Sequence, residues 1–120
     1  MHYVDGFVIP IPKRYLPKYL KIAKKAARIF KENGALEDHE CVADDVKVPP
    51  GMASPFPKLA KAKRGETVVF SWITYKSRQH RDRVNAKVMK DPRMLKMMKE
   101  PMPMDPKRMA YGGFKVKVDA

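Results

Sequence analysis

The chain has 120 residues, which is enough for one domain with one hydrophobic core and too few for two. Hydrophobic residues make up 44% of it and charged residues 32%, a globular composition that argues against a wholly disordered chain. No apolar stretch approaches the roughly 20 residues of a membrane-spanning helix, and the N-terminus lacks the pattern of a secretory signal. We therefore expect one domain, residues 1–120, in the cytoplasm and without a membrane partner.

Charge and cysteine content narrow the partners and compartments that this chain could have. The 26 lysines and arginines exceed the 13 acids, which gives a net charge of +13. A field of this sign attracts nucleic acids, anionic membrane surfaces and acidic partners, but it says nothing about the fold. The one cysteine, Cys41, excludes an intrachain disulfide and a multi-cysteine zinc site, in keeping with a reducing compartment.

The first half of the chain predicts a strand, a helix, a second strand and a loop. Residues 2–11 alternate with apolar groups on both faces and end at prolines, which cannot donate to a ladder. Residues 13–33 carry an apolar stripe at helical spacing, formed by Leu16, Leu20, Ala23, Ala27 and Phe30. Residues 36–45 hold five acids, which suits an edge strand because charges there discourage pairing between sheets. The proline-rich residues 46–65 predict a long loop that is functional or loosely held.

The second half predicts a strand, a helix and a last strand. Residues 66–76 form the clearest strand, rich in β-branched and aromatic residues and apolar on both faces. Residues 77–90 predict a helix for which Ser77 is the N-cap. Residues 107–118 predict a strand in which two adjacent glycines indicate a bulge or a close backbone approach.

The order of these elements predicts the fold class. Strand, helix, strand, strand, helix, strand is the pattern of a ferredoxin-like α+β unit with a four-stranded antiparallel sheet. That pattern places the first and third strands in the middle of the sheet and the second and fourth at its edges. The composition agrees, because residues 2–11 and 66–76 are the apolar strands and residues 36–45 and 107–118 carry the charges.

Apolar residues on both faces of the central strands predict a dimer. In residues 66–76, one face carries Val69, Ser71, Ile73 and Tyr75 and the other carries Val68, Phe70, Trp72 and Thr74. The two helices of such a unit cover one face only, and we expect the chain to have no other element for the second face. A bare apolar face of this size is unusual on a soluble monomer. We therefore expect a homodimer in which two sheets pack face to face as a dimeric α+β barrel.

Candidate ligand-binding residues come from polar and aromatic groups on the strands. Asp5 shares a strand face with apolar residues, where a carboxylate is costly unless it is paired or hydrogen-bonded. It is a candidate general base, and His39 is the second. Glu37, His39 and Cys41 share one face of their strand and could converge on the same cavity. The aromatic walls of the expected pocket are Trp72, Tyr75 and Tyr111.

Each of these residues also has a structural interpretation. Asp5 could form a structural bond to a loop amide or a basic side chain, and Trp72 could pack in the core. The arginines that follow the third strand are expected to form a solvated helix face and its ion pairs: Arg78, Arg81 and Arg83. The methionines that gather between residues 89 and 109 favour adaptable packing under an irregular segment, with a ligand-adapting surface as the alternative. The three histidines show no metal-ligand spacing, so we expect neither a metal nor a cofactor.

The chain resembles a known family over nearly its whole length. The resemblance is carried by VVFSWITYKSRQHRDRVNAKVMKDPRM, DGFVIPIP, GALEDHECVADDV and KRMAYGGF, at residues 68–94, 5–12, 34–46 and 107–114. These segments are similar to the YbaA-like family of small bacterial proteins, within the dimeric α+β barrel superfamily. The resemblance implies a ferredoxin-like subunit and a dimer, and it implies no established activity or catalytic residues. Relatives in the superfamily include cofactor-independent monooxygenases, lactone isomerases and haem enzymes, which place ligands between the sheet and the helices; fold alone does not transfer function.

Three hypotheses for function follow from the sequence. The first is a dimer that binds a small molecule between sheet and helices, with a cofactor-independent enzyme of proton transfer or oxygenation as its catalytic form. The second is a nucleic-acid-binding protein that acts non-specifically through its basic helical surface, because no base-reading helix is evident. The third is a structural or interaction protein without a ligand.

Overall fold

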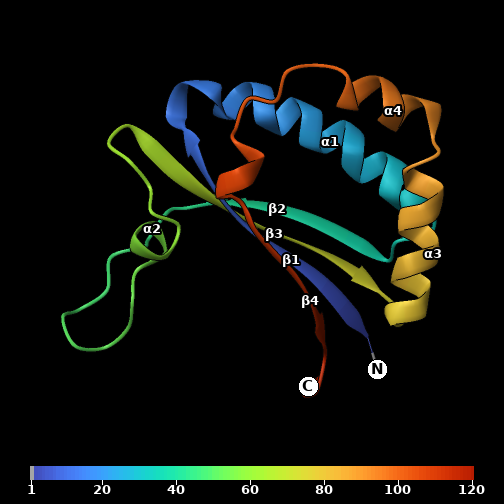
Figure 1. The fold of residues 1–120 in the computed structure, drawn as a ribbon. Helices are drawn as coiled ribbons and strands as arrows, with labels where there is room; N and C mark the ends of the chain where they lie inside the picture. The colour runs from blue at the N-terminus through green and yellow to red at the C-terminus, as the bar shows by residue number, and fades with distance from the viewer. Residues whose placement is uncertain (1) are drawn as a thin grey trace.

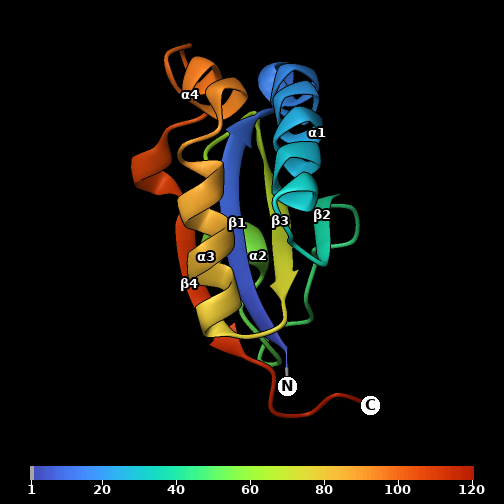
Figure 2. The same cartoon turned by 90° about the vertical axis from the view of Figure 1, so that its right-hand side faces the viewer.

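A computed structural model of the protein describes residues 2–120 and has one sheet between two unequal layers. Four antiparallel strands follow the order β2-β3-β1-β4, with bounds β1 Tyr3–Pro12, β2 Glu37–Val42, β3 Glu66–Tyr75 and β4 Ala110–Lys115. One face is covered by α1 Leu16–Glu32, α3 Arg78–Val88 and α4 Pro92–Met98 (Figures 1 and 2). The short α2, Phe56–Leu59, lies on the other side of the sheet (Figure 1). Short 3-10 helices occur at Lys13–Tyr15 and Pro106–Arg108.

The strand order confirms the prediction that the apolar strands are central. β1 pairs with β3 along its whole length, from Tyr3 opposite Tyr75 to Pro12 opposite Glu66. β4 pairs with β1 only as far as Val8, so Pro10 and Pro12 lie where β1 has a single neighbour and a missing donor is tolerated. The acidic β2 is an edge strand, as its composition predicted.

The helix boundaries follow local chemistry. Pro17 lies in the first turn of α1, where its missing N–H would have no partner in any case. Gly34, at φ +116°, provides the left-handed position that ends the helix. The hydroxyl of Ser77 accepts a hydrogen bond from the backbone N–H of His80 at 3.1 Å, which confirms it as the N-cap of α3.

The hydrophobic core lies between the sheet and the helical layer and has two clusters. The first contains the buried residues Tyr3, Ile29, Ala35, Ile73, Tyr75, Val84, Val88 and Met94. The second contains Ile9, Ile11, Tyr19, Val69 and Met104. The sheet residues of both clusters fall on one set of alternate positions, so the other set faces away from the helices.

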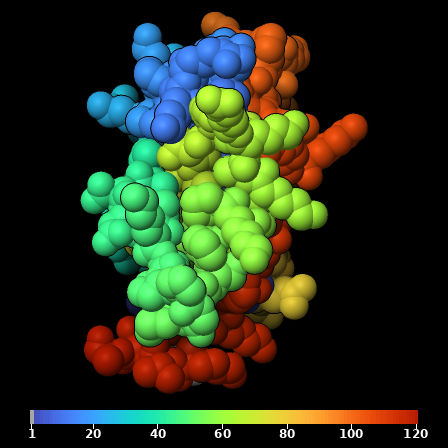
Figure 3. Space-filling view, turned by 90° about the vertical axis from the view of Figure 1, so that its left-hand side faces the viewer, coloured from blue at the N-terminus to red at the C-terminus, as the bar shows by residue number. Residues whose placement is uncertain are grey.

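The face away from the helices is covered at one end only. Contrary to the expectation that the chain has nothing for this face, the segment 43–65 packs over it with α2 (Figure 3). The Phe56 ring lies 5.7 Å from the Phe70 ring, and Val68 beside it is 2% exposed. Phe70 itself stays 43% exposed at the edge of this cover, and Phe114 beyond it is 63% exposed. The segment can pack in this way because its few apolar side chains, Phe56 among them, contact β3.

Candidate functional site

A cavity of about 210 Å³ lies between the sheet and α1. Apolar side chains form most of its wall, from β1, β3 and the buried side of α1: Phe7, Ile9, Ile73, Ile22, Ala23, Ala26 and Phe30. Its remaining wall comes from the segment 102–109, which runs from α4 toward β4. An apolar hollow with a few polar groups is the usual form of a small-molecule site.

Four polar side chains reach this cavity: Asp38 and Glu40 from β2, Ser71 from β3 and Tyr19 from α1. The two acids are two residues apart on a strand, so both point to the same face. Their register with β3, Asp38 opposite Ile73 and Glu40 opposite Ser71, makes that face the one beneath the helices. The Tyr19 hydroxyl donates a short hydrogen bond to Glu40 Oε1 across the cavity wall.

Asp38 differs from Glu40 in having no cationic or hydrogen-bonding partner among residues 2–120. Burial, together with the neighbouring charge of Glu40, raises the pKa of Asp38 to about 6. Burial and Glu40 also raise the pKa of Tyr19, so its hydroxyl stays protonated and remains a donor. The pair therefore presents one carboxylate that is held by a tyrosine and one that can take up a proton near neutral pH.

Methionines close the cavity on the side of the 102–109 segment. Met102, Met104 and Met109 all contribute to its wall, together with Pro103 and Pro106. Met104 is buried, whereas Met102 is 50% exposed. The methionine cluster noted in the sequence therefore includes a wall of the cavity, where flexible thioether side chains can adjust to different shapes.

Asp5 lies outside this cavity, in a buried ion pair. Its carboxylate is 2.7 Å from Arg81 Nη1, and the two side chains are only 3% and 12% exposed. The same guanidinium donates to the Tyr111 hydroxyl at 3.1 Å and to Asp82 Oδ1 at 2.8 Å, and it stacks 5.0 Å over the Tyr3 ring. Burial raises the pKa of Asp5, and the Arg81 charge opposes that rise. Asp5 and Tyr111 are thus joined through Arg81. This arginine forms ion pairs as expected, but its expected position on a solvated face is wrong, because its side chain is largely buried against the sheet.

The structure does not bring the other expected residues to Asp5. His39 and Trp72 lie on the opposite face of the sheet, with their rings 5.0 Å apart. The reason is the register: Asp5 stands opposite Ile73, so Trp72, one residue earlier on β3, points to the other side. The His39 ring is half exposed and lies 3.0 Å from Glu37 Oε2. The expectation that Glu37, His39 and Cys41 converge on a cavity with Asp5 is therefore wrong.

Tyr75 belongs to the core rather than to a ligand-binding wall. It is fully buried, and its hydroxyl donates to Asn85 Oδ1 at 3.4 Å. Sequence reasoning missed Asp38, Glu40 and Tyr19, because the acids of β2 were interpreted as edge-strand charges. The signal was the alternation itself: the side of β2 that pairs with Ser71 and Ile73 must face the helices once those residues do.

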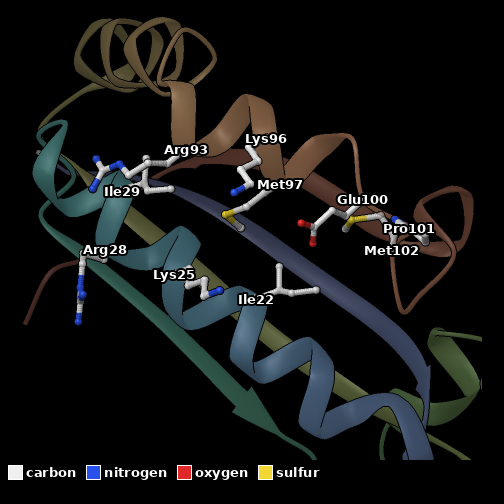
Figure 4. Close-up of a pocket in the computed structure, with 10 residues that line it drawn as sticks. All are labelled: Ile22, Lys25, Arg28, Ile29, Arg93, Lys96, Met97, Glu100, Pro101 and Met102. Atoms are coloured by element: carbon white, nitrogen blue, oxygen red, sulfur yellow. The ribbon is translucent and has the colours of Figure 1, made fainter.

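A second hollow, a groove of about 340 Å³, lies between α1 and α4 (Figure 4). Four cations line it, two from each helix: Lys25 and Arg28, and Arg93 and Lys96. Ile22 and Met102 line both this groove and the cavity, so the two hollows are neighbours. We name this hollow the α1–α4 groove.

Within residues 2–120, no three His, Cys, Asp or Glu side chains gather closely enough to hold a metal ion. None of the helices described over the same residues has the length and apolar character needed to cross a membrane.

The family of the chain is shown by comparison with known proteins. The family described as "Protein of unknown function (DUF1428)" matches residues 2–106, and the chain belongs to it. The chain is 50% identical over 119 residues to the uncharacterized protein YbaA of Escherichia coli strain K12, with 99% of both chains covered. The protein of the same name from Shigella flexneri matches to the same extent. The resemblance inferred from the sequence is therefore confirmed.

Among solved structures, the de novo designed protein Foldit4 is similar in fold. The two share 12% sequence identity at a TM-score of 0.50, over 98% of this chain and 100% of that one. At this identity the likeness concerns the fold alone, an α+β arrangement with a four-stranded antiparallel sheet.

Proposed function

We propose that this protein binds a small molecule in the cavity between the sheet and α1. The observation that carries the proposal is the placement of Asp38, an unpaired and half-buried carboxylate, on the wall of a mostly apolar cavity. A buried carboxylate without a partner lowers stability, and such groups are more frequent in functional sites than elsewhere. The ligand that fits has an apolar body and a hydroxyl or similar donor that Asp38 and Glu40 accept.

We infer further that Asp38 is the group that would transfer a proton in a catalytic form of this site. A base with a pKa of about 6 is mainly ionised at neutral pH and still takes up a proton readily. The Tyr19 hydroxyl, already donating to Glu40, keeps the second carboxylate in place beside it. This assignment replaces Asp5 and His39, the bases expected from the sequence, and it requires no cofactor.

A binding experiment with phenol and 1-hexanol tests the proposal. Isothermal titration should detect binding of at least one of them to the wild-type chain. Ala26→Phe, which fills the cavity, should abolish that binding, whereas Ala86→Phe, on the exposed side of α3, should leave it unchanged. Circular dichroism establishes that both variants fold. Binding that survives Ala26→Phe would contradict the proposal. Failure of both phenol and 1-hexanol to bind the wild-type chain would also contradict it.

We propose that the subunit is a ferredoxin-like unit and that a second copy covers the open part of its sheet. The support is an apolar hollow of about 670 Å³ on the face away from the helices, which Phe70, Trp72 and Phe114 line with small residues of β1 and β4. Apolar patches of several hundred Å² on a soluble chain are usually interaction sites. Sheet-to-sheet packing of two copies would remove this surface from water and leave the cavity on each helical side free.

Analytical ultracentrifugation at micromolar concentration tests the dimer. The wild-type chain should sediment as a dimer, and Trp72→Lys should convert it to a monomer. Lys47→Glu, in the segment 43–65, changes charge without entering the hollow and should leave the dimer intact. A stable wild-type monomer would overturn both the dimer and the barrel architecture.

A second candidate function, non-specific nucleic-acid binding, is favoured by one observation. The exposed side of α1 presents Lys18, Lys21, Lys24, Lys25 and Arg28 without an acid until Glu32. Such binding would weaken steeply with salt, because it rests on release of counterions from phosphates. Sequence-selective binding that persists at physiological salt would contradict it. For either function, the single cysteine supports a reducing compartment, and we propose the cytoplasm.

A further inference from the structure

We infer that the ligand of the proposed cavity carries an anionic group, and that the α1–α4 groove holds this group between Lys25 and Lys96. The inference rests on the proposed function, since it names the chemical class of the same ligand. That class is an amphipathic anion: a carboxylate or phosphate monoester on a short apolar chain.

The charges of the groove carry the first step of the argument. Of its four cations, Arg93 is already paired, with Glu32 at 2.7 Å and with Asp91 at 2.9 Å. Lys25 and Lys96 have no ion pair or hydrogen bond among residues 2–120. They come from opposite walls of the groove, one from α1 and one from α4, whereas Arg28 points away from it (Figure 4). Two unpaired ammonium groups across a hollow repel each other, and an anion between them removes that repulsion.

The acid in the groove sets the direction of the ligand. Glu100 lies at the end of the groove near Pro101 and Met102, beyond the two lysines (Figure 4). An anion would therefore be held at the lysine end and not beside Glu100. The groove keeps an excess of positive charge, since its two unpaired lysines outnumber this one carboxylate.

The relation of the two hollows carries the second step. Ile22 and Met102 form part of both walls, so the boundary between groove and cavity is apolar and includes a flexible, half-exposed methionine. The polar groups at the other end are the carboxylates Asp38 and Glu40, which repel an anion and accept from a donor. A ligand that lies across the boundary thus has an anionic head in the groove, an apolar middle at Ile22 and Met102, and a donor group at the carboxylates.

The test compares four probes by isothermal titration: 1-hexanol, hexanoate, hexyl phosphate and hexylamine. Hexanoate or hexyl phosphate should bind at least tenfold more tightly than 1-hexanol, and hexylamine should bind more weakly than either anion. The variant Lys25→Gln/Lys96→Gln should lose that tenfold advantage, about 1.4 kcal/mol, and should leave 1-hexanol binding unchanged. The preference for phosphate or for carboxylate then identifies the head group.

A matched control separates the groove from the general charge of the protein. Lys24→Gln/Lys87→Gln removes the same two charges from exposed positions of α1 and α3 outside the groove, and it should bind the anions as the wild type does. All four lysines are exposed, so both variants should fold. Equal affinity for hexanoate, hexyl phosphate and 1-hexanol, or equal losses in the two variants, would overturn the inference while the cavity proposal stands. Failure of all four probes to bind would overturn the proposed function with it.

Discussion

Two aspartates lie in one row across the sheet, on the side of the helices, and their surroundings differ completely. Asp5 of β1 and Asp38 of β2 both stand opposite Ile73 of β3, one on each side of that strand. Asp5 is 2.7 Å from the Arg81 guanidinium and is enclosed by Tyr3 and Tyr111. Asp38 faces Glu40 and an apolar cavity.

The difference shows that burial alone does not make a carboxylate functional. Asp5 is the more deeply buried of the two, yet its charge is matched, so its role is to hold α3 against β1 and β4. Asp38 has a raised pKa because burial and then the charge of Glu40 oppose its ionisation, and no ion pair among residues 2–120 offsets them. Of the two, the unmatched group is the one that we propose as a ligand-binding group, and four predictions test this contrast.

The largest expected effect is that of Asp5→Asn. It leaves the Arg81 charge largely buried without its main partner, which should lower the free energy of unfolding by about 3 kcal/mol. Urea unfolding followed by circular dichroism measures this. Asp82→Asn is the matched control, because Asp82 contacts the same guanidinium but is 60% exposed. It should lower the free energy of unfolding by less than about 1 kcal/mol.

A second variant keeps this prediction informative. In Asp5→Asn/Arg81→Met the unpaired cation is gone, so the double variant should be more stable than Asp5→Asn alone. Equal stability of the two, or an unchanged Asp5→Asn variant, would mean that the ion pair is not what holds α3 to the sheet.

The next effect comes from crowding the same cluster through the backbone. A Cβ at Gly113 would overlap the Tyr3 hydroxyl and lie 2.8 Å from its ring carbons Cε1 and Cζ. Because Tyr3 is buried and stacks against Arg81, Gly113→Ala should lower the free energy of unfolding by about 2 kcal/mol. At the neighbouring Gly112 a Cβ meets the Phe114 ring at 3.5 Å, an ordinary contact. Thermal unfolding should therefore separate the two variants, and identical melting temperatures would show that Tyr3 moves freely.

Asp38→Asn should act in the opposite direction. The pKa of Asp38 is about 6 in the folded chain and 3.8 ordinarily, so ionisation opposes folding. The stability associated with the protonated group is fully present below about pH 4 and is lost as the pH rises through 6. The variant should therefore be more stable than the wild type at pH 8, by about 1–2 kcal/mol after allowance for solvent screening, and no more stable at pH 4.

Urea unfolding at pH 4, 6 and 8 measures this dependence. Cys41→Ser provides a comparison on the same strand, because Cys41 is exposed on the other face of β2, does not contribute to the pKa of Asp38, and should leave the difference between pH 8 and pH 4 unchanged. A loss of stability on Asp38→Asn at pH 8 would show that the carboxylate is matched after all.

The smallest expected effect is that of Tyr19→Phe. It removes the hydrogen bond to Glu40 and leaves the ring in its place in the core, so the free energy of unfolding should fall by about 1 kcal/mol or less. Tyr15→Phe, at an exposed tyrosine one turn earlier, should have no measurable effect. Differential scanning calorimetry at pH 7 compares the two, and a larger loss than that of Asp5→Asn would reverse the contrast between the sites.

The amino-acid sequence by itself determined the family, the central and edge strands, and the approximate position of each main element. These properties follow from local pattern: β-branched and apolar runs give strands, a 3.6-residue stripe gives α1, and Ser77 and Gly34 mark helix ends. Acidic composition was also sufficient to place β2 at an edge. Such signals depend only on residues that are close in the sequence, so they can be interpreted without knowledge of the fold.

Only the tertiary structure decided which residues share a site. Strand alternation divides β2 into two sides but does not by itself say which side the helices cover. The sequence analysis took the side of His39 as the one that faces the cavity, whereas the side of Asp38 faces it. Likewise, nothing near Arg81 in the sequence indicates that it reaches Asp5, 76 residues away. The partner of a charge is set by the packing of α3 on the sheet. The same residue type therefore has two roles: Asp5 of β1 forms a structural ion pair, and Asp38 of β2 is a candidate ligand-binding group.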